Sequence, residues 1–212
     1  MVSKTSGERE SKQGSHPTKE ELIRTVVTML DEQTLDEITS EKVLEISGVS
    51  RGSLYHHFED FAELLELAQV RRFSSYVTHS IAVLTEVFSE VDSRETLIAR
   101  CALAARDLQD PQLSQVRMER MTAISKVMNN SRMATALGNE QERLTETIAD
   151  LFQGMQVRGY GNPQLEPRTA AVLFQAYALG RTIDDFTPLH MDPENWLYAV
   201  TRIIENVFFP AH

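Results

Sequence analysis

Residues 38–65 read ITSEKVLEISGVSRGSLYHHFEDFAELL, and the rest of the fold can be argued from this stretch. Thr39 is a candidate N-cap of a first short helix, because its hydroxyl can accept a backbone N–H. Gly48 can end that helix, because glycine tolerates a positive φ. Ser50 is a second candidate N-cap, and the helix after it carries Arg51–His56. Two short helices joined by so tight a turn predict a helix-turn-helix, whose second helix enters the DNA major groove.

The same stretch resembles the signature of the TetR family of transcriptional repressors. The motif GVSRGSLYHHF is followed by AELL, over roughly the first third of the chain. The residues that match the family pattern in order are Gly48, Val49, Ser50, Gly52, Leu54, Tyr55, Phe58, Glu63, Leu64 and Leu65. The resemblance implies an all-α fold of about nine helices. It also implies an N-terminal helix-turn-helix DNA-binding head and a larger helical body with a ligand cavity.

Two positions depart from the family pattern. Phe61 stands where the family usually has a lysine near a DNA phosphate, and the acidic Glu59 and Asp60 precede it. Leu44 stands where the family usually has a small residue between the two helices. Both departures argue against a tight DNA complex.

The charge balance points the same way. The net charge is −10, and residues 1–60 hold seven Lys and Arg against twelve Asp and Glu. Because neutralisation of phosphates drives nonspecific DNA affinity, we expect a modest phosphate footprint.

Composition limits the class and location of the protein. A chain of 212 residues suits one or two domains. No apolar run approaches the ~20 residues of a membrane helix, so no membrane partner is expected. The N-terminus has no apolar core typical of a secretory signal. The single cysteine, Cys101, excludes an intrachain disulfide and fits a reducing cytoplasm.

Three regions are expected along the chain. Residues 1–17 are expected to form a disordered polar tail. This tail is either a terminus without a binding role or a basic arm that enters the minor groove of DNA. Residues 18–60 form the helix-turn-helix DNA-binding domain. Residues 61–212 form the ligand-binding and dimerisation domain.

Apolar periodicity predicts the remaining helices, and no stretch predicts a β-strand. The first helix spans Thr18–Leu30, with Thr18 as its cap. A long helix begins at Phe61 and runs to Tyr76 or beyond, with a break at residues 91–93. The other expected helices are Arg94–Leu108, Leu113–Met128, Arg132–Val157, Glu166–Phe186 and Pro193–Phe208.

The residues expected to contact a double-stranded DNA operator lie at the two caps and along the second helix. Arg51 and Ser53 suit base edges, because the arginine fork pairs with guanine. Tyr55 and His56 suit phosphates, although Tyr55 is also compatible with a core position. The full set is Thr39, Ser50, Arg51, Gly52, Ser53, Tyr55 and His56.

Methionine and aromatic residues on the central helices are the candidate contacts for a small hydrophobic or amphipathic ligand, with ordinary core packing as the alternative. They are Met118, Met121, Phe152, Met155, Phe174 and Tyr177. The candidate polar contacts in such a cavity are Arg117, Arg120, Gln175 and Asp184.

No catalytic site, metal site or cofactor is predicted. Asp184, Asp185, His190 and Asp192 would suit a metal if their loop folded back, and a solvated loop is the alternative. Cys101 lies on an apolar helix face without an activating partner and is expected to be inert core.

Two functions follow from these patterns. The first is a ligand-responsive transcriptional repressor, a homodimer joined through Glu166–Phe186 and Pro193–Phe208. The second is an all-helical sensor or enzyme that has lost DNA binding. The motif at residues 38–65 favours the first, and the acidic head with Phe61 favours the second.

Overall fold

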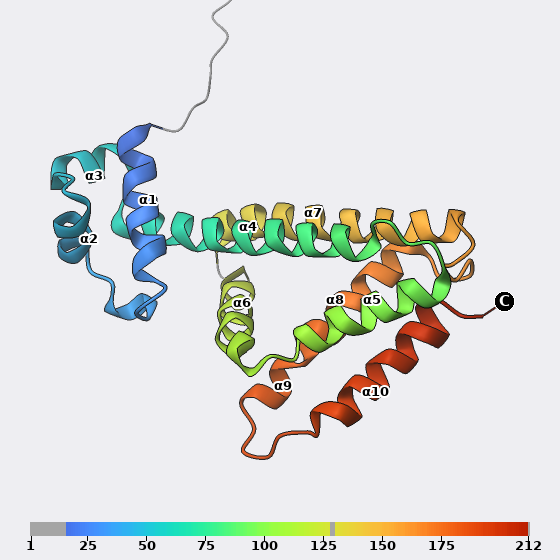
Figure 1. Ribbon diagram of the computed structural model, residues 1–212. Coiled ribbons are helices and arrows are strands. Elements are labelled where there is room, and N and C mark those ends of the chain that lie inside the picture. The colour runs from blue at the N-terminus through green and yellow to red at the C-terminus, as the bar shows by residue number, and fades with distance from the viewer. Residues whose placement is uncertain (1–15, 128–129, 212) are drawn as a thin grey trace, which may run out of the picture. The chain divides into compact units, whose positions relative to one another are not determined.

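A computed structural model describes residues 16–127 and 130–211, which form helices and connecting loops without a β-strand (Figure 1). This part of the chain holds ten α-helical segments, one of them a single turn, so the expected all-α fold of about nine helices is confirmed. Most of the expected polar tail and Met128 lie outside the described residues. The chain divides into two compact units, the first ending at Arg71 and the second beginning at Arg72.

The first unit contains α1 (Pro17–Met29), a 3-10 turn η1 (Leu35–Glu37), α2 (Ser40–Ser47), α3 (Arg51–His57) and the start of α4 (Phe61–Phe88). Apolar side chains from each of these α-helices meet in one core. Its buried members are Leu22, Ile23, Val26, Met29, Leu30, Ile38, Val43, Leu54, Phe58, Leu64 and Ala68. The core therefore holds α3 from one side only, and its opposite side remains in solvent.

The helix-turn-helix has the local geometry that its sequence predicts. The Thr39 hydroxyl accepts the N–H of Lys42 at 3.4 Å, and the Ser50 hydroxyl accepts the N–H of Ser53 at 3.2 Å. Gly48 ends α2 in the left-handed region, with a φ of 67°. Thr39, Gly48 and Ser50 therefore have the roles expected of them.

The first helix begins one residue earlier than expected, and its cap lies two residues before the expected Thr18. The side chain of His16 caps α1 by accepting the N–H of Thr18 at 3.3 Å, and Pro17 occupies the first turn. Proline suits that place because its φ is helical and its missing N–H would have no helical partner. Thr18 consequently lies inside the helix that it was expected to cap.

The second unit begins within α4 and continues through α5 (Arg94–Asp107), η2 (Pro111–Leu113), α6 (Ser114–Lys126) and α7 (Ser131–Val157). It ends with α8 (Pro167–Gly180), the single turn α9 (Thr182–Asp185), α10 (Pro193–Ile203) and a π-helical turn η4 (Ile204–Phe208). The expected break at residues 91–93 is present, and the Ser93 hydroxyl caps α5. The expected helix Glu166–Phe186 is instead divided between α8 and α9 at Arg181.

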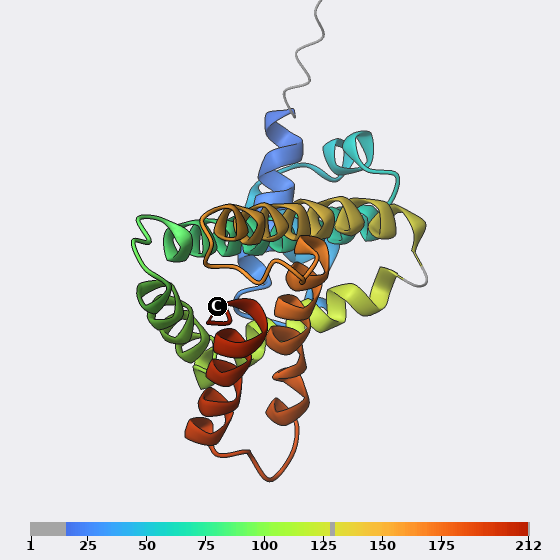
Figure 2. The same cartoon turned by 90° about the vertical axis from the view of Figure 1, so that its right-hand side faces the viewer.

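An aromatic cluster forms the centre of the second unit. The Phe152 ring on α7 lies 5.1 Å from that of Phe208 and 5.6 Å from that of Phe209, between ring centroids. Phe88, at the end of α4, lies 5.7 Å from Phe152. In this unit α7 packs against α8, and α5 packs against α10. Figure 2 shows α8 running downward from α7, with α5 and α10 as neighbours below. None of the helices in the described residues has the length and apolar character that a bilayer span requires.

Candidate DNA-binding surface and ligand cavity

The α3 helix has one buried face and one exposed face. Leu54 is fully buried and Phe58 is 2% exposed. The Tyr55 ring is 50% exposed, so it does not belong to the core. Of the seven residues expected at DNA, Ser53 is partly buried and the others are exposed, namely Thr39, Ser50, Arg51, Gly52, Tyr55 and His56. The fold thus gathers these residues at the N-termini of α2 and α3 and along the outer face of α3.

Arg51, the arginine expected to contact DNA bases, already forms an ion pair with Glu41. Arg51 Nη2 donates to Glu41 Oε1 at 2.7 Å, which joins α3 to α2 across the turn. Both side chains are more than half exposed. The pair partly neutralises the guanidinium that would meet DNA, a feature that the sequence analysis missed. The ten-residue separation across a turn gave no local signal for it.

Three histidines meet at the N-terminus of α1 and the C-terminus of α3. The ring centroids of His16 and His57 are 4.5 Å apart, and those of His56 and His57 are 5.0 Å apart. Partial desolvation, together with the positive charge of neighbouring His16, His56 and Lys19, lowers the pKa of His57. At neutral pH His57 therefore adds little positive charge to this surface.

The two departures from the motif have a packing role. Phe61 and Leu44 are both partly buried against the core of the first unit. Phe61 therefore contributes apolar contact at a position where a lysine would contribute a phosphate contact.

The second unit contains a cavity of about 480 Å³ among α4, α6, α7 and α8. Its apolar lining comes from Phe73, Ile124, Val127, Ala134, Leu137, Gly138, Val172, Ala176 and Leu179. Its polar lining comes from Arg120, Gln141, Thr145 and Gln175. Arg120 and Gln175 are two of the polar contacts expected from the sequence.

The methionine and aromatic residues expected at a ligand lie elsewhere in the second unit. Phe152 and Met155 are buried. Phe152 belongs to the aromatic cluster, and its ring centroid lies 6.4 Å from that of Phe174. Met118 and Met121 are exposed on α6. Tyr177 lines a second cavity, of about 520 Å³, together with Trp196 and residues of the α9–α10 loop. The sequence of α7 contained a signal for the 480 Å³ cavity. Gly138, Gln141 and Thr145 lie at helical spacing on the same face as Leu137.

A chain of polar groups runs along the cavity wall. Arg120 Nη1 donates to the Tyr76 hydroxyl at 2.8 Å, and its Nη2 donates to Gln141 Oε1 at 3.4 Å. Gln141 Nε2 donates to Gln175 Oε1 at 2.5 Å. Gln175 Nε2 in turn donates to the Thr145 hydroxyl at 3.1 Å. Each partner of the arginine in this chain is neutral.

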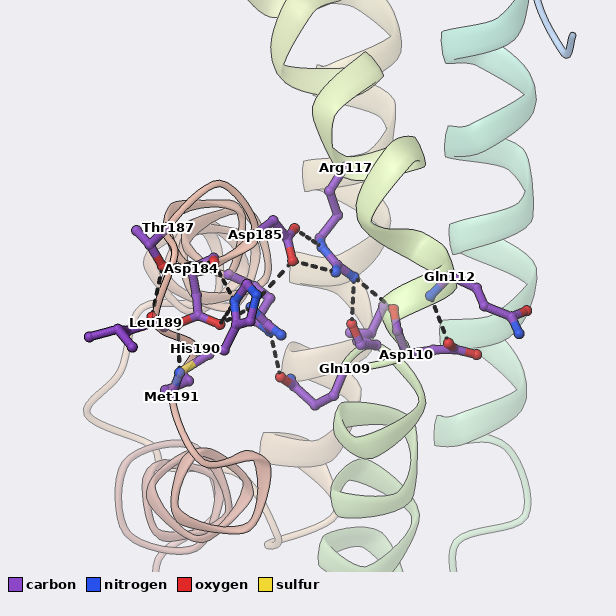
Figure 3. A network of polar contacts seen from close by, with 12 residues as sticks. Gln109, Asp110, Gln112, Arg117, Asp184, Asp185, Thr187, Leu189, His190 and Met191 are labelled. Atoms are coloured by element: carbon purple, nitrogen blue, oxygen red, sulfur yellow. Dashed lines mark hydrogen bonds and ion pairs between the residues drawn. The ribbon is translucent and has the colours of Figure 1, made fainter.

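An ion pair between Arg117 and Asp185 joins α6 to α9 (Figure 3). Arg117 donates to both oxygens of Asp185, at 2.6 and 2.8 Å, and also to the Leu108 carbonyl at 3.0 Å. Arg181 pairs with Asp184 at 2.7 Å. The hydrogen bonds and charge of Arg117, together with the charges of Arg181 and His190 nearby, hold the pKa of Asp185 below its usual range.

These contacts correct the expectations for this loop. The Asp185 side chain is only 5% exposed, so this part of the loop is not solvated. Arg117 is engaged with protein groups and does not line the 480 Å³ cavity. Asp184 pairs with Arg181 and lines the 520 Å³ cavity together with Tyr177. Among residues 16–127 and 130–211, no three His, Cys, Asp or Glu side chains are grouped as metal ligands would be.

Comparisons with known proteins address the fold. A solved structure from Mesorhizobium loti, described as a TetR-family transcriptional regulator, superposes with a TM-score of 0.66 at 17% identity, over 91% of this chain and 97% of that one. A transcriptional regulator from Saccharomonospora viridis, solved in complex with choline, has a TM-score of 0.66 at 14% identity, over 91% and 98% of the two chains. Both structures share the architecture of this chain from the head through the body.

Sequence comparison gives a partial match. The nucleoid occlusion factor SlmA of Shewanella baltica is 27% identical over 140 residues, which are 66% of this chain and 62% of that protein. The match thus spans less than two thirds of the relative's length. No family model matches the chain.

Proposed function

We propose that this protein, which has the fold of the TetR family of transcriptional regulators, is a ligand-responsive DNA-binding repressor that acts as a homodimer on a palindromic operator. The observation that carries the proposal is the exposed face of α3. It presents Arg51, Tyr55 and His56 to solvent while Leu54 and Phe58 anchor the helix in the core. A recognition helix needs this division, because its outer side chains must reach base edges and phosphates.

A dimer is supported by apolar side chains left in solvent on the last long helices. Leu173 on α8 is 41% exposed, and Tyr198 on α10 is 69% exposed. Apolar groups of this size, gathered on two helices, are typical of an interface. Two helices from each protomer would form a four-helix bundle, and the two heads would read half-sites about one DNA turn, ~34 Å, apart.

Regulation by a small hydrophobic or amphipathic molecule is supported by the 480 Å³ cavity. Its volume lies in the range of about 300–1,000 Å³ that is usual for small-molecule sites. A ligand that releases the operator must bind the DNA-free conformation more tightly. By linkage, operator DNA must then weaken ligand binding by the same factor.

The experiment is a mobility-shift titration of the full chain against DNA from upstream of its own gene, with scrambled DNA as the control. The repressor should prefer the upstream DNA at moderate salt, and replacement of Arg51 and Tyr55 by alanine should abolish that preference. An equal affinity for both DNAs at every salt concentration would contradict the proposal. It would instead favour the sensor or enzyme without DNA binding that the acidic head suggests.

A further inference from the structure

We propose that the 480 Å³ cavity takes an amphipathic anion, whose carboxylate pairs with Arg120 and whose apolar part lies between α6, α7 and α8. The inference rests on the ligand-responsive function proposed above and names the chemical class of its ligand. Three observations carry it: the neutral surroundings of Arg120, the weak hydrogen bonding of its guanidinium and the apolar lining beyond it.

Arg120 carries a charge that the described residues do not balance. Its hydrogen bonds go to the Tyr76 hydroxyl and to the Gln141 amide, and its guanidinium lies 4.6 Å from the Tyr76 ring centroid. In the described part of the chain, no carboxylate forms an ion pair with it. A partly buried cation is normally paired, because desolvation penalises an isolated charge.

The neighbouring arginine on the same helix shows the contrast. Arg117, one turn earlier on α6, donates through Nε and Nη2 to both oxygens of Asp185. The corresponding edge of Arg120 is almost unused, because its Nε is buried without an acceptor and its Nη2 reaches Gln141 only at 3.4 Å. A carboxylate in the cavity would take the place of the neutral Gln141 amide at Nη2, and this charge-assisted hydrogen bond would be stronger than the present 3.4 Å contact.

The rest of the cavity suits an apolar chain or ring. Leu137, Val172 and Leu179 are among its nine apolar lining residues. Gly138 lies in the same lining, and a Cβ built on it would meet no atom within 4 Å. The space beside α7 is therefore open at this point.

The sign of the charge that Arg120 would bind differs from that of a molecule found with a structural relative. The Saccharomonospora viridis regulator was solved with choline, a cation. Arg120 would repel a quaternary ammonium group, so choline should not bind this protein at concentrations where a carboxylate does.

Isothermal titration calorimetry of the full chain tests the proposal with octanoate and its neutral analogue octanamide. The wild-type protein should bind octanoate at least about tenfold more tightly, a preference of about 1.4 kcal/mol. Arg120→Gln should remove the preference while octanamide affinity stays the same. Arg143→Gln is the matched control: Arg143 is on α7, pairs with Glu140 and is not part of the cavity lining. It should keep the preference.

A second variant covers the case in which Arg120→Gln unfolds. Gly138→Leu fills the open space beside α7, should leave the helix intact and should weaken octanoate and octanamide alike. Equal binding of octanoate and octanamide by the wild type would overturn the proposal, as would octanoate binding that survives Gly138→Leu. The mobility-shift titration is scored separately. Octanoate binding without DNA binding contradicts only the repressor function, and DNA binding without octanoate binding contradicts only this inference.

Discussion

Arg51 on α3 and Glu41 on α2 form an ion pair across the helix-turn-helix, with 2.7 Å between Nη2 and Oε1. Hydrogen bonds from the backbone of Glu41 itself and from Ser40, together with Arg51, lower the pKa of the Glu41 carboxyl. The glutamate therefore stays ionised near neutral pH and competes with DNA for the arginine. This pair defines the first prediction.

Removal of the Glu41 charge should tighten DNA binding. Glu41→Gln frees Arg51 and also removes a negative charge that phosphates would meet, so we expect a several-fold higher affinity for all DNA sequences. Fluorescence anisotropy with labelled DNA measures the change. Glu45→Gln, on the same helix and also exposed, is the control that separates release of Arg51 from a general charge effect. An equal gain in both variants would show that the pair is irrelevant.

Loss of Arg51 should reduce sequence preference and not only affinity. A bidentate arginine–guanine contact contributes about 1–3 kcal/mol of discrimination, and Arg51→Ala should lose it at one base position per half-site. Selection of DNA from a random pool measures the preference. Arg24→Ala removes an equal charge from the exposed face of α1 and should weaken binding without changing the selected sequence. If Arg51→Ala selects the wild-type sequence, the base contact lies elsewhere.

Two glycines should respond in opposite ways to alanine. Gly48 has a φ of +67°, where a side chain costs about 1–2 kcal/mol, so Gly48→Ala should lower the free energy of unfolding by about that amount. Gly154 is helical in α7, and Gly154→Ala should raise it by about 0.5–1 kcal/mol. A Cβ meets no atom within 4 Å at either site, so the backbone alone decides the sign. Urea denaturation measures both, and a stabilised Gly48→Ala variant would contradict this account of the turn.

The Arg117–Asp185 pair should make stability depend on acid pH. Asp185→Asn leaves a buried guanidinium without its carboxylate, and should reduce stability at pH 7 by on the order of 3 kcal/mol. Since folding lowers the pKa of Asp185, its contribution is complete above the unfolded value of about 3.9 and is lost as pH falls below it. The difference between variant and wild type should therefore shrink below about pH 4.

Thermal denaturation from pH 7 to pH 3 measures that convergence. Asp150→Asn, an exposed change on α7, should stay within about 0.5 kcal/mol of the wild type. A constant gap between Asp185→Asn and wild type at all pH values would mean that the pair does not titrate as described.

The buried cysteine should be unreactive in the native protein. Cys101 is 8% exposed, and burial raises the pKa of its thiol to about 12. A thiol-specific disulfide reagent at pH 8 should modify it only in denaturant, where its pKa is about 8.5. The folded thiol retains its proton while the unfolded thiol loses it, so stability should also fall as pH rises above about 8.5. Cys101→Ala should lack this alkaline loss.

The local parts of the fold followed from sequence alone. Thr39, Gly48 and Ser50 act through hydrogen bonds or backbone angles within a few residues of themselves, so their roles could be predicted from their order in the chain. The same holds for the break before α5, where Ser93 caps its own helix. On α3, Leu54 is buried and Tyr55 is exposed. The orientation of this helix could be predicted because a short amphipathic helix turns its apolar face to the core.

The contacts that define the body depend on tertiary structure. Arg117 and Asp185 are separated by 68 positions, and Arg94 donates to the Phe209 carbonyl across 115 positions. Apolar periodicity assigns Phe152 and Leu137 alike to an inward helix face, yet Phe152 enters an aromatic cluster and Leu137 lines a cavity. The other elements that pack against α7 separate these two environments: Phe88 of α4 with Phe208 and Phe209 at one, and α6 with α8 at the other. The sequence by itself therefore determined most of the helices, the caps of the helix-turn-helix and the amphipathic character of α3, because these depend on neighbours in the chain. The cavity and the unpaired Arg120 depend on how whole helices approach one another, and tertiary structure alone decides this.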